Sequence, residues 1–311
     1  MFKKNISSLH LPHNKNTAEC VPVKIDAPEK VILPMDMHSG GLAEPVVSVG
    51  DYVRVGQLIA KEAGRFSSPV HATVSGKVIA VEPMLRASGK EVLAIHIEND
   101  GKMEIDPSVK APVINNCDEF LQALRDSGIV GLGGAAFPTW AKLNEMRNDE
   151  YTVDTVLVNA AECEPYITSD HRMMVDHPEL IVAGVDYLRN HMFEYLKDAK
   201  FKICIEKNKP DAIATLKEAF AGKEYVEIVE LDAIYPQGAK QVMLYNATGR
   251  VSIAGKRFPY FHAIIINVSS LAKVAEYLNT GMPLVERIVT VDGPAVANPQ
   301  NLIAPIGTRI S

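Results

Sequence analysis

Four segments of this chain carry residue types suited to binding a phosphorylated ligand, and the first is a glycine-rich loop at residues 128–137. Its glycines are Gly128, Gly131, Gly133 and Gly134. Without a Cβ atom they let the backbone approach a ligand closely, and Pro138 then suits the first position of a helix. Free N–H groups at such a helix start attract phosphate, and Lys142 would add a positive charge. The spacing matches neither a dinucleotide-binding motif nor a P-loop, so a tight structural turn is the alternative interpretation.

The second segment follows an apolar run and begins at Asn159. Ligands of open α/β sheets bind beyond the carboxyl ends of the strands, where we expect this loop. Asn159 can offer both a donor and an acceptor to a flat heterocycle, while Glu162 and Glu164 can accept hydrogen bonds from ribityl or ribose hydroxyls. Two carboxylates so close also suit a metal ion or acid–base catalysis, and a solvated acidic loop is the structural alternative. Asp170 and His171, nearby, are expected to be structural.

The third and fourth segments each contribute one residue. Gly238 lies between a predicted strand and a predicted helix, and it would again allow close approach of the backbone. Asn267 ends the apolar run 263–266, so its amide is expected at the carboxyl end of a strand. An amide there can bind the edge of a ring, although a helix-capping Asn is equally ordinary.

Composition excludes several classes of protein. At 311 residues we expect two or three domains, and 47% hydrophobic with 23% charged residues excludes a disordered chain. The net charge of −6 provides no general basic field for nucleic acid. No apolar run approaches the ~18 residues of a membrane span, and residues 1–6 turn polar too soon for a signal peptide. We therefore expect a cytoplasmic protein.

The four cysteines form no C-x-x-C pair. This spacing predicts neither a zinc site nor an iron–sulfur cluster within the chain, and reduced thiols are the default at this size. Cys204 lies in an apolar run and is predicted to be plain core.

Hydrophobic periodicity divides the chain into three stretches. Between residues 31 and 99, short apolar runs alternate with turn signals and predict a small β-sandwich or barrel. The predicted strands there are 46–47, 52–55, 77–81 and 93–97. From about residue 117, strands alternate with helices, which predicts an α/β unit with a mostly parallel sheet. Its predicted strands are 155–158, 201–205, 225–229 and 263–267, and its clearest helices are 179–196 and 211–220. Residues 287–311 turn β-like again and are too few for a domain.

These segments, in this order, resemble the RnfC family and the related flavoprotein subunit of respiratory complex I. The runs 44–57 and 68–76 share the resemblance, which covers nearly the whole chain. It implies a multidomain α/β plus β protein with an N-terminal barrel-sandwich hybrid, a central Rossmann-like FMN/NADH-binding α/β domain and the start of a β-grasp (SLBB) module. The implied boundaries are 1–30 for an N-terminal extension, 31–105 for the barrel-sandwich, 112–285 for the Rossmann-like domain and 286–311 for the partial SLBB segment.

The resemblance also implies a function. Family members of this kind bind FMN, accept hydride from NADH and pass single electrons to iron–sulfur clusters. The 4Fe–4S clusters are expected only in a C-terminal region beyond residue 311, so the chain is expected to be a fragment. It would act as an NADH:acceptor oxidoreductase subunit beside a redox partner protein or an Rnf-type complex, in the cytoplasm or peripheral to a membrane complex.

The site residues follow from the matching motifs. The residues expected around the FMN phosphate are Gly131, Gly133, Gly134 and Lys142. Those expected at the isoalloxazine and ribityl parts are Asn159, Glu162 and Asn267, with Gly238 beside them. Phe137 and Glu164 would face the nicotinamide nucleotide. No catalytic residue and no metal ligand is assigned.

Three departures from the family pattern leave alternatives open. Ala161 replaces an acidic residue of the complex I relatives, as expected for the RnfC branch. More seriously, Ala239 and Lys240 stand where relatives tend to carry acid. A docking scaffold with a degenerate flavin site is therefore an alternative. Residues 7–12 lack an expected Gly-Gly, which favours a soluble paralogue such as the electron carriers of D-proline reductase or cobalamin-reduction systems. A lipoyl-type carrier is disfavoured because the turn 62–68 contains no lysine.

Overall fold

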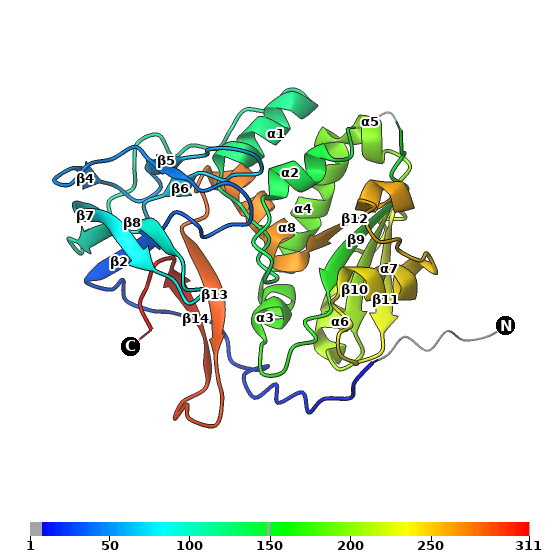
Figure 1. Ribbon diagram of the computed structural model, residues 1–311. Helices are drawn as coiled ribbons and strands as arrows, with labels where there is room; N and C mark the ends of the chain where they lie inside the picture. The colour runs from blue at the N-terminus through cyan, green and yellow to red at the C-terminus, as the bar shows by residue number, and fades with distance from the viewer. Residues whose placement is uncertain (1–7, 148–149, 311) are drawn as a thin grey trace. The chain divides into compact units, whose positions relative to one another are not determined.

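The computed structural model describes residues 8–147 and 150–310 (Figure 1). The expectations about a leader and about Ser7 concern residues outside this part of the chain. The chain divides into two compact units, each described by itself below. The first comprises Met1–Pro22, Glu145–Ala272 and Thr290–Asn301, and the second comprises Val23–Asn144, Lys273–Val289 and Leu302–Ser311. The domain boundaries expected from the sequence stay a prediction.

The first unit is built on a parallel four-stranded sheet with the order β11-β10-β9-β12. The strands are β9 (Thr155–Ala160), β10 (Lys200–Glu206), β11 (Val226–Leu231) and β12 (Ala263–Asn267). Val156, Leu157 and Val158 of β9 are all fully buried. Continuous apolar runs of this kind are typical of parallel strands covered on both faces, so the predicted α/β unit is confirmed.

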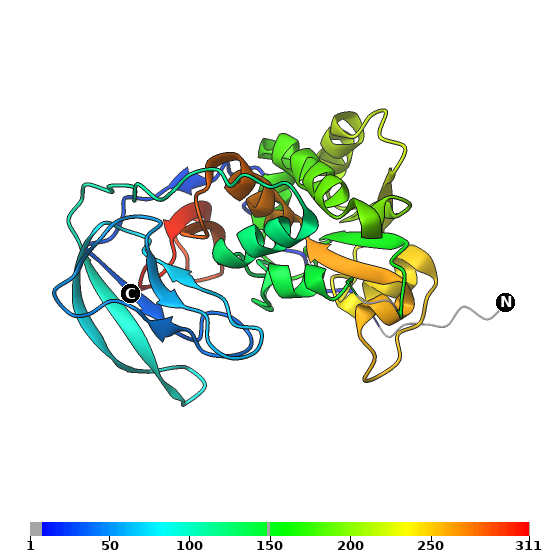
Figure 2. The ribbon, with the colours of Figure 1, turned by 90° about the horizontal axis from the view of Figure 1, so that it is seen from above.

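Helices cover both faces of this sheet (Figure 2). They are α3 (Ser169–Asp176), α4 (Pro178–His191), α5 (Phe193–Leu196), α6 (Pro210–Ala219), α7 (Lys240–Thr248), the 3₁₀ turn η1 (Phe258–Phe261) and the start of α8 (Val268–Thr280). On one face, Met243 and Leu244 of α7 share a core cluster with Leu157 and Cys204. The prediction that Cys204 is plain core is therefore confirmed.

The helix predicted at 179–196 is wrong in its continuity. Helix α4 ends at His191, and Met192 leaves the helical conformation with φ −111° and ψ 30° before α5 begins. The Met192 N–H still donates to the Leu188 carbonyl at 3.0 Å and closes α4. Met192 and Leu196 are both fully buried.

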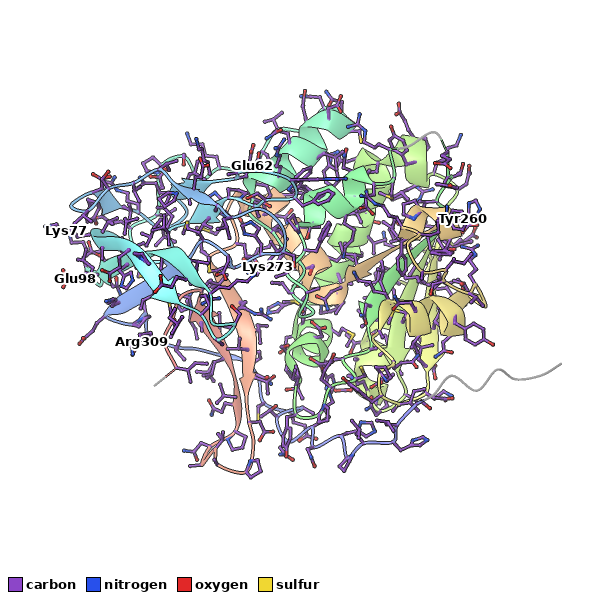
Figure 3. All side chains as sticks on the ribbon, in the orientation of Figure 1. Glu62, Lys77, Glu98, Tyr260, Lys273 and Arg309 are labelled. Atoms are coloured by element: carbon purple, nitrogen blue, oxygen red, sulfur yellow. The ribbon has the colours of Figure 1, made fainter. Side chains whose placement is uncertain are left out.

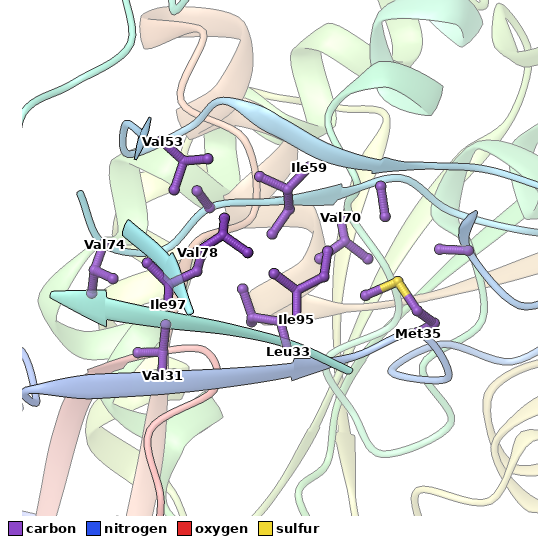
Figure 4. Close-up of a cluster of buried hydrophobic side chains, with 13 residues drawn as sticks. Val31, Leu33, Met35, Val53, Ile59, Val70, Val74, Val78, Ile95 and Ile97 are labelled. Atoms are coloured by element: carbon purple, nitrogen blue, oxygen red, sulfur yellow. The ribbon is translucent and has the colours of Figure 1, made fainter. Parts of the chain in front are cut away.

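The second unit contains two antiparallel sheets with the orders β2-β8-β7-β4 and β3-β5-β6. The strands are β2 (Lys30–Pro34), β3 (Glu44–Pro45), β4 (Tyr52–Val53), β5 (Leu58–Lys61), β6 (Val70–His71), β7 (Gly76–Leu85) and β8 (Glu91–Asn99). Side chains such as Val31, Ile59 and Ile97 fill the core between them (Figure 4). Lys77 and Glu98 are register partners on β7 and β8, and both are exposed (Figure 3). The two sheets thus bury apolar side chains on one face and expose charged side chains on the other, which confirms the predicted small β-sandwich or barrel.

One predicted detail of the β elements is wrong. Residues 46–47 were expected to form a strand, but β3 is Glu44–Pro45, because pairing with β5 joins Glu44 to Lys61 and Pro45 to Ala60. The Pro-rich end of the chain holds a strand, β14 (Gln300–Pro305), in a third sheet with the order β1-β14-β13. Its neighbours are β1 (Val23–Lys24), which pairs with β14 in parallel, and β13 (Glu286–Val291).

The second unit also holds α1 (Cys117–Asp126) and α2 (Thr139–Asn144). Asn116 caps α1, since its side-chain oxygen accepts a hydrogen bond from the Glu119 N–H. Among the helices of residues 8–147 and 150–310, none combines the length and the apolar character that a bilayer span requires.

Candidate functional site

The parallel sheet of the first unit has a topological switch point. The chain runs from β9 outward to β10 and β11, and then returns to place β12 on the other side of β9. Loops that leave the carboxyl ends of β9 and β12 therefore diverge, and open α/β sheets bind their ligands in the crevice this leaves. Asn159 and Asn267 are register partners at these two strand ends. The structure thus brings together two of the predicted site residues where the fold favours a ligand.

Asn159 also forms a hydrogen bond with Gly238, which is the residue of the third predicted segment. Its Nδ2 donates to the Gly238 carbonyl at 3.1 Å, and its Oδ1 accepts from the Ala161 N–H at 3.2 Å. The Gly238 N–H donates to the Cys163 Sγ at 3.2 Å. A Cβ on residue 238 would lie 3.4 Å from that sulfur, within ordinary van der Waals contact, so the loop already lies close against the strand end. Cys163 is a contributor that the sequence did not point to.

Asn267 has two partners within the protein. Its Oδ1 accepts from the Ser270 N–H at 3.0 Å, so the residue caps the start of α8 as the alternative interpretation held. Its Nδ2 donates to Asp170 Oδ2 at 2.7 Å. Asp170 is buried and also accepts from the Ser269 hydroxyl. The Asn267 amide is therefore held in a fixed orientation at the strand end.

Glu162 is a buried carboxylate rather than part of a solvated loop. Its backbone is left-handed, with φ 48°, and the residue is 6% exposed. The two carboxylate oxygens accept from the Asp170 N–H at 2.7 Å and the His171 N–H at 3.2 Å, at the start of α3. Burial, with a smaller contribution from Asp170, raises the pKa of Glu162 to about 8. The solvated-loop interpretation is wrong for Glu162 but fits Glu164, which is exposed.

Two lysines that the sequence did not point to lie beside this loop. Lys15 Nζ donates to the carbonyls of Glu162 at 2.7 Å, Glu164 at 2.9 Å and Ile167 at 2.6 Å. Lys209 Nζ donates to the Ala161 carbonyl at 2.6 Å and pairs with Glu206 at 3.3 Å. Both members of that pair are almost fully buried. The attraction of these lysines opposes the effect of burial on Glu162.

His171 does not form a pair with Asp170. Its Nε2 lies 2.8 Å from the Asp211 carboxylate, and burial lowers its pKa despite that partner. The ring joins α3 to α6, which carries Asp211. This agrees with the structural role that we expect from the sequence.

The glycine-rich loop belongs to the second unit. The Gly131 N–H donates to the Phe137 carbonyl at 2.9 Å, and the Ala136 N–H donates to the Gly131 carbonyl at 3.2 Å. These bonds close the base of the loop and leave Gly133 and Gly134 exposed. Gly134 has φ +106°, and a Cβ there would meet nothing within 4 Å. The exposed tip therefore fits the close approach of a ligand to the backbone.

The elements flanking the loop add order and charge. Helix α2 begins at Thr139, one residue later than expected, and carries the half-buried Lys142. The Phe137 ring lies 5.4 Å from that of Phe66. Arg287 Nη2 donates to the Leu132 carbonyl at 3.1 Å, which places a guanidinium at the loop. None of residues 131–137 is acidic, so the charge of this region also fits a phosphate group.

Comparisons with known proteins decide the family. Residues 4–102 match the family described as the RnfC barrel sandwich hybrid domain, and residues 124–276 match the Nuo51 FMN-binding domain. The chain is 39% identical over 303 residues to the C subunit of the Na(+)-translocating ferredoxin:NAD(+) oxidoreductase complex of Acetobacterium woodii. That alignment covers 96% of this chain and 67% of the relative. The chain belongs to the RnfC family.

Two further C subunits are similar to nearly the whole of this chain. Identity is 35% to the C subunit of the proton-translocating ferredoxin:NAD(+) oxidoreductase complex of Clostridium ljungdahlii, with 99% of this chain and 67% of the relative covered. It is 36% to the C subunit of the ion-translocating oxidoreductase complex of Serratia proteamaculans, with 97% and 42% covered. The chain thus spans two thirds or less of the length of these relatives.

A solved structure supports the fold. An NAD+-reducing [NiFe]-hydrogenase in the air-oxidised state aligns with a TM-score of 0.51 at 24% identity, over 61% of this chain and 37% of that one. The matched FMN-binding domain, residues 124–276, contains every predicted site residue from Gly131 to Asn267. Their individual contacts with a ligand stay predictions.

Proposed function

We propose that this RnfC-family chain binds FMN, accepts hydride from NADH and passes electrons to iron–sulfur clusters that lie beyond residues 1–311. The observation that carries the proposal is the match of residues 124–276 to an FMN-binding domain whose sheet has Asn159 and Asn267 paired at its switch point. Bound FMN supplies the chemistry, since it takes up two electrons together and releases them one at a time.

The chain's own residues would hold and orient the flavin. The paired amides of Asn159 and Asn267 are already fixed by hydrogen bonds, so they can present donors and acceptors to a ring without further ordering. Glu162, held on the start of α3, would face the ribityl part. Gly238 would let the backbone approach beside Asn159.

The phosphate and the nicotinamide nucleotide need different groups. Exposed amides at Gly133 and Gly134, with Gly131 at the base of the loop and the charge of Lys142, suit the phosphate. Phe137 and the exposed Glu164 would face the nicotinamide nucleotide. The names of the relatives from Acetobacterium woodii and Clostridium ljungdahlii refer to ferredoxin:NAD(+) oxidoreductase complexes, which supports NADH as the substrate.

The partner would be a redox protein or an Rnf-type complex, because the relatives are named as subunits of such complexes. The chain would then lie in the cytoplasm, peripheral to a membrane complex. Strands β13 and β14 would begin an SLBB module that continues beyond residue 311.

A docking scaffold with a degenerate flavin site is the second candidate. It is favoured by Ala239 and Lys240, which follow Gly238 directly. Lys240 is exposed as the first residue of α7, where a positive charge meets the positive end of the helix dipole. The two candidates differ in whether flavin bound to the chain is reduced by NADH.

Anaerobic addition of FMN and then NADH tests the proposal. The chain is loaded with FMN, passed over a desalting column to remove free flavin and mixed with NADH while absorbance near 450 nm is followed. We expect the bound flavin to bleach. Flavin that is retained but stays oxidised would support the scaffold, and flavin lost on the column would contradict FMN binding.

A further inference from the structure

The loop at residues 162–167 follows β9 and carries Glu164, and its backbone is strained on both sides of that residue. Glu162 has φ 48° and Tyr166 has φ 70°. Both values lie in the left-handed region, which residues other than glycine rarely adopt and which is especially unfavourable for a bulky side chain. Such conformations persist only where the surrounding structure holds them in place. The contacts of the loop therefore show what fixes it.

The side chain of Lys15, which is half-buried, binds three backbone carbonyls of this loop. Its Nζ donates to the carbonyls of Glu162 at 2.7 Å, Glu164 at 2.9 Å and Ile167 at 2.6 Å. An ammonium group has three N–H donors, so this arrangement uses all of them. One side chain from the N-terminal segment thus gathers carbonyls from both ends of the loop around a single positive charge.

The part of the loop from Glu164 to Ile167 has little other hydrogen-bonded support. The Tyr166 N–H donates to the His13 carbonyl at 3.0 Å, and the Ile167 N–H donates within the loop, to the Pro165 carbonyl. Within the part of the chain that the structure describes, residues 164–167 form no further hydrogen bond or ion pair. Segment 13–15 therefore fixes the backbone that carries the Glu164 side chain.

Glu162, at the other end of the loop, is held independently of Lys15. Its carboxylate accepts hydrogen bonds from two N–H groups at the start of α3. Lys209 Nζ donates to the preceding carbonyl, that of residue 161, at 2.6 Å. Removal of Lys15 should therefore release the backbone around Glu164 and leave the Glu162 carboxylate in position.

We propose that Lys15 is a positioning residue for the nicotinamide nucleotide, because it fixes the backbone that orients Glu164. The inference rests on the proposed function, in which Glu164 faces the nucleotide and Glu162 faces the ribityl part of the flavin. A loop that is ordered before NADH binds loses no further backbone freedom on binding, so Lys15 raises the affinity for NADH. The affinity for FMN does not depend on it.

Kinetics of the flavin-loaded Lys15→Met chain test this division. We expect KM for NADH to rise about tenfold, while kcat and the Kd for FMN stay within about twofold. A general disturbance of the fold would change all three together. The control is Lys200→Met, which also removes a lysine that donates to a backbone carbonyl, that of Glu224 at 2.7 Å, but at the first residue of β10. It should leave KM unchanged. An unchanged KM in Lys15→Met, or equal losses of NADH and FMN affinity, would overturn the proposal.

Hydrogen exchange of the flavin-free chain tests the structural step by itself. The backbone amides of residues 164, 166 and 167 should exchange about tenfold faster in Lys15→Met than in the wild type. Unchanged exchange within α3 shows that the variant is folded. Equal exchange of the loop in both chains would overturn the proposal. Because no ligand is present, a wild type that fails to bind FMN would contradict the proposed function and leave this result unaffected.

Discussion

The carboxyl edge of the parallel sheet and the glycine-rich loop differ in the groups that they can present to a ligand. At the sheet edge, Asn159, Glu162 and Asn267 are held by hydrogen bonds to other parts of the first unit. At the loop tip, Gly133 and Gly134 leave the backbone exposed, and the neighbouring charges are positive. A flat heterocycle needs fixed amides, whereas a phosphate needs open N–H groups and cations.

The two regions also differ in what stabilises them. The sheet edge depends on the buried ion pair of Lys209 with Glu206, each of which needs its partner because burial penalises an isolated charge. The loop depends on backbone bonds between Gly131 and its neighbours and on Ser39, whose hydroxyl donates to the Ala135 carbonyl at 2.6 Å. Substitutions at the sheet edge should therefore affect stability, and those near the loop should affect binding.

The largest effect is expected from Lys209→Met. Removing the lysine leaves the buried Glu206 carboxylate without its partner, which should lower the free energy of unfolding by about 3–5 kcal/mol. Chemical denaturation measures this, with Lys207→Met as the control, because the exposed pair of Lys207 with Asp232 should contribute far less to stability. Equal costs for the two variants would show that the sheet edge does not depend on buried charge.

The pH dependence of stability sharpens the same contrast. The pKa of Glu162 is about 8 in the folded chain and near 4.5 when unfolded, so the folded state binds the proton more tightly. Its contribution to stability is therefore fully present below pH 4.5 and is lost as the pH rises through 8. Relative to Glu162→Gln, the wild type should lose roughly 3 kcal/mol of unfolding free energy between pH 5 and 8.

Denaturation of both chains at a series of pH values gives this difference. Glu164→Gln is the control, since it makes the same change at an exposed side chain of the same loop. Parallel curves for the wild type and Glu162→Gln would contradict the raised pKa.

Near the loop, Lys142→Ala tests binding rather than stability. Loss of one charge beside the phosphate should weaken FMN binding by about 1–3 kcal/mol, and the wild-type affinity should fall with added salt. Fluorescence titration of FMN measures both effects. Lys217→Ala, at an exposed pair with Glu230, is the control. Unchanged affinity in Lys142→Ala across salt concentrations would remove this lysine from the phosphate.

The smallest expected effect separates the flavin from the nicotinamide side. Glu164→Gln should lower kcat/KM for NADH by about tenfold, near 1.4 kcal/mol, while the Kd for FMN stays within about twofold. Steady-state oxidation of NADH by the flavin-loaded chain gives kcat/KM, and the FMN titration gives the Kd. An equal loss of both would place Glu164 on the flavin side.

The sequence predicted the sheet of the first unit well because its strands are short continuous apolar runs. Strands β9, β10 and β12 fall within one or two residues of the predicted ranges. The break at Met192 was missed because the apolar spacing of Leu188, Met192 and Leu196 continues through it and no Gly or Pro marks it. The bounds of β14 could not be predicted from the β-like pattern of residues 287–311 alone, because the strand pairs with β1, almost three hundred residues earlier.

In the candidate site, the residues at strand ends were predictable and the contacts from remote segments were not. Asn159 and Asn267 stand at strand ends, and periodicity locates strand ends, so their pairing follows from the fold. The contributions of Lys15 and Arg287 come from segments remote in sequence and have no local signal. The burial of Glu162 likewise depends on α3 folding back over its carboxylate, which no spacing reveals.

The most direct test of a flavin site at the switch point is the equilibrium binding of FMN to the wild type and to Asn159→Leu and Asn267→Leu. Fluorescence quenching gives the Kd, and circular dichroism confirms that each variant is folded. We expect one FMN per wild-type chain and at least tenfold weaker binding in both variants, because each loses an amide fixed at the sheet edge. Wild-type affinity in both folded variants would place the flavin elsewhere and contradict the account.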